Sequence, residues 1–166
     1  MKKLFLLAIA GALAACTSQP QNAQQMRDAV RGGAAFTTID RYVVARPFAT
    51  AFANIRANAD RCFNTVVRYS YMDSGLVHSE SVPWHSFSRQ TGQNTAETTL
   101  QMAKDAIGPK MPEGGWIKLL TDIEGMAADK TTLTVYRVSI PSTMADISQA
   151  LPAWAEGKPT PCPKLG

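Results

Sequence analysis

The sequence predicts an α+β domain in two layers, in which an antiparallel sheet of five or six strands carries two helices on one face. Two amphipathic stretches accompany a run of β-branched and aromatic segments, which gives the order strand, helix, five strands, helix. The connections between the strand segments are short, and short connections favour antiparallel neighbours. Each helical stretch has one apolar stripe and therefore needs one face of a sheet to cover.

The first strand and the first helix are expected to follow one another directly. Residues 36–45, FTTIDRYVVA, are rich in β-branched and aromatic side chains, which is typical of a strand. Pro47 then suits the first turn of a helix, while Arg46 before it is biased away from the helical region. Apolar side chains recur from here at steps of three and four and form one stripe, namely Phe48, Phe52, Ile55, Ala59 and Cys62.

Five further strands are expected in the middle of the chain, at residues 64–71, 76–82, 95–103, 116–124 and 131–140. Asp73, Ser74 and Gly75 predict the turn between the first two of these strands. Residues 83–92 hold several large side chains and are interpreted as a loop. Residues 105–115 hold two prolines and three glycines, which is typical of a turn region.

The last helix is expected to begin after Pro141, with the Ser142 hydroxyl as its cap. Its apolar stripe consists of Met144, Ile147, Leu151 and Trp154. Pro152 lies inside this pattern and is expected to kink the helix or to end it early. The tail, GKPTPCPKLG, cannot be helical.

The first sixteen residues have the pattern of an export signal. Lys2 and Lys3 precede a short apolar run at residues 4–10, which is too short for a permanent membrane span. The tetrad Leu13-Ala14-Ala15-Cys16 resembles the lipobox of bacterial lipoproteins. The resemblance implies cleavage before Cys16, acylation of Cys16 with palmitate among the acyl groups, and attachment to a lipid bilayer. The alternative is an ordinary secretory signal with an incidental cysteine.

The resemblance also implies a location. Thr17, rather than aspartate, follows the cysteine, and in lipoproteins of this kind that implies sorting to the outer membrane with the domain facing the periplasm. Residues 16–33 would then be the acylated cysteine and a flexible tether, because they are polar and rich in Gln, Asn and Gly. As a flexible coil, the seventeen residues 17–33 span roughly 20–25 Å. Within them, only a transient helix is expected, at residues 24–31. The expected division is therefore 1–15 signal peptide, 16–33 tether and 34–166 folded domain.

The domain pattern resembles the helix-on-sheet domains of several envelope lipoproteins, including accessory lipoproteins of the outer-membrane β-barrel assembly machine. It is also similar to small envelope lipoproteins whose first helix starts with Arg-Pro-Phe and whose tail carries Ala-Trp-Ala-Glu-Gly before a cysteine. These resemblances cover residues 34–162 and imply a binding or accessory module. A fold alone does not confer a function.

Cys62 and Cys162 remain once Cys16 is acylated. An isolated pair of cysteines in an oxidising periplasm predicts one disulfide, which the tail would close by returning to the end of the first helix. Two buried thiols, or a metal site shared with histidine, are the alternatives.

The residue patterns do not point to an enzyme, a metal site or a cofactor. His78 and His85 are seven residues apart, a spacing that does not suit two ligands on one strand. Asp122 and Glu124 share a strand face as glycosidase carboxylates do, but near a turn they are interpreted as solvated charges. The sequence has no Gly-x-Ser-x-Gly, Ser-x-x-Lys or Cys-x-x-Cys motif. Basic residues are dispersed, so nucleic acid is not an expected partner.

The placement of aromatic residues suggests a contact surface. The hypothesis is that Tyr69, Tyr71, Trp84, Phe87 and Trp116 form a face for an envelope protein partner or an apolar ligand. The alternative is that tyrosines favour strands and that the loop aromatics fold back to close the core. The sequence therefore predicts a periplasm-facing binding or accessory module, or a carrier with an apolar cavity between the first helix and the sheet.

Overall fold

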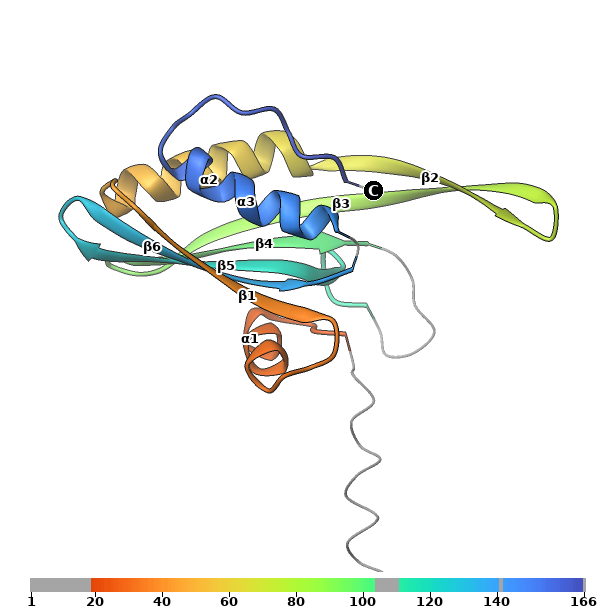
Figure 1. The fold of residues 1–166 in the computed structure, drawn as a ribbon, viewed down its shortest axis with the longest axis horizontal. Helices are drawn as coiled ribbons and strands as arrows, with labels where there is room; N and C mark the ends of the chain where they lie inside the picture. The colour runs from red at the N-terminus through yellow and green to blue at the C-terminus, as the bar shows by residue number, and fades with distance from the viewer. Residues whose placement is uncertain (1–18, 104–110, 141, 166) are drawn as a thin grey trace, which may run out of the picture.

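Six antiparallel strands form one sheet, and helices pack on both of its faces (Figure 1). The structure, a computed structural model, describes residues 19–103, 111–140 and 142–165. The elements are α1 (Ala23–Arg31), β1 (Thr37–Val44), α2 (Phe48–Phe63), β2 (Thr65–Asp73), β3 (Leu76–Gly92), β4 (Thr95–Met102), β5 (Trp116–Ala127), β6 (Lys130–Val138) and α3 (Thr143–Ala155). The predicted α+β class is confirmed.

The strands lie in the order β1-β6-β5-β4-β3-β2, so β1 and β2 are the two edges. Short turns join β2 to β3, β3 to β4 and β5 to β6, as the sequence predicts, and β4 also pairs with β5. β1 instead pairs with the last strand, with Thr37 opposite Val138 and Val44 opposite Thr131. Helix α2 therefore carries the chain across the sheet from one edge strand to the other.

The larger core lies between the sheet and the two helices α2 and α3, which Figure 1 shows side by side over one face. The predicted stripe of α2 is confirmed in Ile55 and Ala59, which are fully buried, and in Cys62. Trp154 of α3 and Leu133 of β6 are also at 0% exposure. Burial of apolar surface supplies most of the energy that holds such layers together, at roughly 25 cal/mol per Å².

The opposite face carries a helix that the tether interpretation did not include. α1 buries Ala23, Met26 and Val30 against Ile117, Leu120 and Tyr136 of the sheet. Asn22 caps the helix by accepting a hydrogen bond from the Gln25 amide at 2.9 Å. Residues 23–31 thus belong to the folded part of the chain and not to a flexible tether, because three apolar side chains at helical spacing find a sheet face to cover.

β3 is longer than expected, since residues 83–92 continue the strand instead of forming a loop. Val82, Trp84 and Ser86 alternate into the core. The Pro83 carbonyl accepts a hydrogen bond from the Ala103 amide at 2.9 Å, so the backbone groups of Pro83 face the end of β4. The amide and the carbonyl of one residue in an antiparallel strand point to the same neighbour. The amide hydrogen that Pro83 lacks would therefore not have bonded to β2, and the pairing of β3 with β2 is unaffected.

α3 also departs from expectation at both ends. Ser142 makes no side-chain hydrogen bond to the helix and has helical dihedral angles, so the predicted cap is absent. The helix passes through Pro152 and ends at Ala155. Leu151, Trp154 and Ala155 are buried on either side of the proline, and this packing outweighs the lost backbone hydrogen bond. Pro141 lies outside the described residues.

Candidate contact surface

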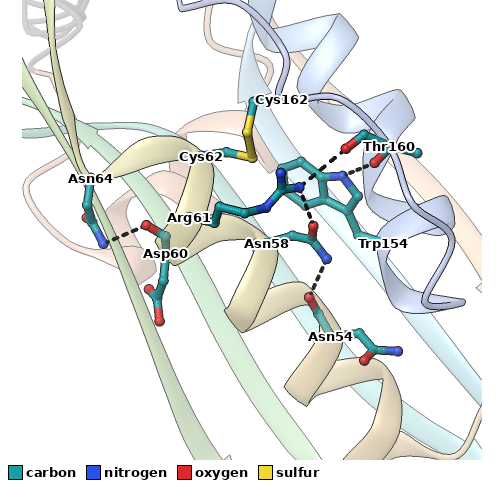
Figure 2. Close-up of a disulfide and its surroundings, with 9 residues drawn as sticks. All are labelled: Asn54, Asn58, Asp60, Arg61, Cys62, Asn64, Trp154, Thr160 and Cys162. Atoms are coloured by element: carbon teal, nitrogen blue, oxygen red, sulfur yellow. Dashed lines mark hydrogen bonds between the residues drawn. A yellow bond between two sulfur atoms is a disulfide. The ribbon is translucent and has the colours of Figure 1, made fainter.

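The predicted disulfide joins the end of α2 to the C-terminal tail. Cys62 and Cys162 are bonded, with a Cα–Cα distance of 5.3 Å across 100 residues of sequence. Figure 2 shows Trp154 and Thr160 beside the disulfide, and Arg61 donates a hydrogen bond to the Thr160 carbonyl at 3.3 Å. The tail is therefore attached to α2 and α3 at Thr160 and Cys162, and Leu165 beyond them is buried in the larger core.

The five aromatic residues predicted to share a contact surface do not lie together. Trp84 and Trp116 are 2% and 1% exposed, so neither contributes to a surface. The indole of Trp84 donates a hydrogen bond to the Tyr69 hydroxyl at 3.2 Å, and Tyr69 packs against the larger core. For these three residues the alternative interpretation, closure of the core, is correct.

Tyr71 and Phe87 are exposed, but in different places. Tyr71 lies near the turn between β2 and β3 and stacks on His78, with ring centroids 5.4 Å apart. Phe87 lies in β3 on the face that carries α1, and its ring rests over Gly114. A Cβ at Gly114 would come within 2.5 Å of that ring, which explains glycine at this position. The two rings therefore belong to separate surfaces.

Among the residues that the structure describes, several strongly exposed apolar side chains gather at the tip of the β2–β3 hairpin, which we call the β2–β3 arm (residues 65–82). Figure 1 shows the arm extending beyond the other strands and helices. Its apolar side chains near the turn are between 53% and 75% exposed, namely Tyr71, Met72, Leu76 and Val77. Sequence reasoning missed Met72, Leu76 and Val77, although their clustering around a predicted turn was a visible signal.

The backbone of the arm suits a tight hairpin. Asp73 pairs with Leu76, and the two residues between them, Ser74 and Gly75, have φ values of 49° and 81°. Positive φ at both central positions is the geometry of a turn that matches the twist of the strands. β2 is also an edge strand, so one side of its backbone has no neighbouring strand. The arm thus presents apolar side chains and an open strand edge together.

Two polar clusters of the structure join elements that are far apart in the sequence. Arg27 of α1 contacts Asp122 at 2.9 Å and Glu97 at 2.8 Å. Glu97, only 8% exposed in its side chain, also binds Arg89 at 2.7 Å. Asp122 is therefore engaged by α1, while its predicted partner Glu124 is exposed. The hydrogen bond to Asp122 raises the pKa of Arg27 against the effect of burial.

The second cluster lies between β1, β6 and α3. Asp40 accepts hydrogen bonds at 2.6 Å from Arg137 and at 2.6 Å from Ser148, whose hydroxyl also lies 3.1 Å from that of Tyr42. Burial alone would raise the pKa of Asp40, but the hydrogen bonds from Arg137 and Ser148 together bring it below the ordinary value. The cluster joins α3 to the edge of the sheet.

No group of three or more metal-ligating side chains occurs within residues 19–103, 111–140 and 142–165. His85 lies beside Phe87, with ring centroids 6.3 Å apart, while His78 is in the arm, so the two histidines occupy different surfaces. In the same part of the chain, no helix is both long and apolar enough to cross a membrane.

A groove of about 690 Å³ lies where the start of α2 meets the β5–β6 turn. Phe48, Phe52 and Met126 line its apolar side, and Gln90 and Asn94 contribute amides. The space between α2 and the sheet is filled by core side chains, so the groove lies at the rim of the layer. It borders α2 but does not lie between that helix and the sheet, where the cavity of a carrier was expected.

Comparisons with known proteins add little to this geometry. No protein-family model matches the chain, and no curated protein matches it significantly. Among solved structures, the chain is similar to the one titled "Crystal structure of Ara h 8.0201", at 13% identity and a TM-score of 0.35. The match covers 73% of this chain and 95% of that one. This degree of similarity carries no argument about function.

Proposed function

We propose that this chain is an outer-membrane lipoprotein, anchored through acylated Cys16, which acts as a periplasm-facing binding or accessory module. We further propose that the β2–β3 arm is the surface by which it contacts an envelope protein. The observation that carries this proposal is the apolar tip, where Met72 and Val77 are 75% and 70% exposed. Clustered exposed apolar side chains are typical of interaction sites.

The edge strand supports the same proposal. Edge strands are usually shortened, covered or interrupted by proline, because their free backbone groups can pair with another chain. β2 has nine residues and contains neither proline nor a bulge. A partner strand could therefore add to β2 while the apolar side chains supply the specific contacts.

Site-specific photo-crosslinking in living cells tests this function. A photoreactive amino acid replaces Met72, and in a matched control it replaces Met126, which is 65% exposed at the β5–β6 hairpin. We expect a discrete crosslinked protein with the Met72 probe and none with the Met126 probe. No adduct with the Met72 probe, or the same adducts from both positions, would contradict the role of the arm.

The groove beside Phe52 favours a second candidate, a carrier of a small apolar ligand. Its volume of about 690 Å³ lies in the range of ordinary ligand sites. If the carrier function holds, protein purified from its own membrane releases an apolar molecule on solvent extraction, and Phe52→Asp loses that molecule. If the wild-type protein releases none, the carrier function is excluded.

A further inference from the structure

We infer that the surface around Phe36 and Ile140 rests on the lipid bilayer that holds the anchor. This inference depends on the proposed acylation of Cys16 and adds to it an orientation of the domain. The two residues are 69% and 63% exposed, and they border an apolar hollow of about 370 Å³ between α1, the start of β1 and the end of β6.

The position of the first described residues brings this surface to the membrane. The Pro20 carbonyl accepts a hydrogen bond from the Ile117 amide at 3.4 Å, and Lys118 donates to the Gln19 side chain at 2.9 Å. The chain is therefore attached to the start of β5 at residues 19 and 20. Gln19 and Pro20 themselves line the hollow.

The length of chain between this attachment and the anchor is short. Cys16 and Gln19 are three residues apart, and three residues span at most about 10 Å when fully extended. A tether that ran to residue 33 would have held the domain well clear of the lipid headgroups. Because α1 packs on the sheet, the hollow instead lies within a few residues of the acylated cysteine.

The chemistry of the surface fits lipid. The lining of its hollow includes Met26, Ala29 and Val138 and contains no charged side chain, so the hollow itself presents no carboxylate to anionic headgroups. The Phe36 carbonyl accepts a hydrogen bond from the Ser139 amide at 2.7 Å, which brings Phe36 and Ile140 to the same end of the sheet. Phe36 has a φ of 59°, a costly conformation for an aromatic residue, and its ring points into solvent instead of the core.

Depth-dependent fluorescence quenching tests the orientation in the full, acylated protein. Phe36→Trp, Ile140→Trp and the control Met126→Trp are each inserted into vesicles of phosphatidylethanolamine and phosphatidylglycerol with brominated acyl chains. The native Trp84, Trp116 and Trp154 are at most 2% exposed and give the same background in all three variants. We expect the introduced tryptophan to lose more than about half of its emission in at least one of the Phe36→Trp and Ile140→Trp variants. An interfacial contact places the indole ring at the boundary of the acyl chains. The tryptophan at 126 should be almost unaffected.

Vesicle flotation and mass spectrometry of the same samples separate the possible failures. If the acylated protein floats with the vesicles but positions 36 and 140 are no more quenched than 126, the orientation is wrong and the anchor stands. If Cys16 carries no acyl group, both the orientation and the proposed anchoring are wrong. A Phe36→Ser/Ile140→Ser variant serves as a second measurement: its unfolding midpoint should stay unchanged while its transfer between vesicles becomes several-fold faster. Unchanged transfer would overturn the inference.

Discussion

The guanidinium of Arg27, on the helix that covers the second face of the sheet, lies 2.8 Å from the buried carboxylate of Glu97 in β4. The same group holds Asp122 of β5. Arg27→Met should therefore destabilise the protein by about 1–3 kcal/mol, because it removes charged hydrogen bonds from partly buried carboxylates. Denaturant unfolding measures the change.

Arg56→Met is the matched control for that substitution. Arg56 contacts Asp60 only at 3.8 Å, and both side chains are largely exposed. Such pairs contribute less than about 1 kcal/mol. Equal losses for the Arg27 and Arg56 variants would show that the contact between α1 and the sheet is not specially stabilised by charge.

Removal of the disulfide should cost much more. Cys62 and Cys162 are 100 residues apart, and a closed loop of about that length contributes roughly 4.7 kcal/mol in the chain-entropy model. The double variant Cys62→Ala/Cys162→Ala should therefore unfold at a far lower denaturant concentration. A loss below about 1 kcal/mol would show that the tail contacts around Thr160 suffice without the bond.

The Asp40 cluster predicts a dependence on pH. Hydrogen bonds from Arg137 and Ser148 hold the folded pKa of Asp40 below its ordinary value of 3.8. The ionised carboxylate thus contributes stability above about pH 4, and this contribution is lost as the pH falls through the folded pKa. Asp40→Asn should cost about 1–3 kcal/mol at pH 7 and progressively less below pH 4. A difference that stays constant down to pH 2 would refute this assignment.

Truncation of two aromatic side chains on neighbouring strands should change the stability of the protein to very different extents. Trp84 is 2% exposed, so Trp84→Ala should destabilise the protein by about 3–5 kcal/mol. Tyr71 is 53% exposed at the arm, and Tyr71→Ser should change stability by less than about 0.5 kcal/mol. Thermal or denaturant unfolding of both variants distinguishes a core residue from a surface residue. A large loss for Tyr71→Ser would mean that the arm packs more tightly than its exposure indicates.

The elements with strong local signals could be predicted from the sequence. The stripe of α2 and the β5–β6 hairpin follow from side-chain periodicity. The disulfide follows from the pair of cysteines that remains if Cys16 is acylated. α1 was missed as a packed helix because its polar composition outweighed Met26 and Val30, which only gain their role when a sheet face is present. Local patterns also end the strand of β3 before Pro83, because they do not show that the backbone carbonyl of Pro83 faces the end of β4.

The contact surface was the least predictable part. Residue type pointed to Trp84 and Trp116, yet both complete the core. Exposure of Met72 and Val77 depends on how far β2 and β3 extend beyond the covering helices. That distance is set by the lengths of several elements together, so the alternation of residues in a single strand cannot give it.

The acylation of Cys16 can be measured by the mass of the mature N-terminal peptide of protein purified from its native membrane. We expect a peptide that begins at Cys16 and carries acyl groups on that residue. A peptide that retains residues before Cys16, or one that begins at an unmodified Cys16, would contradict the anchored module and the orientation derived from it.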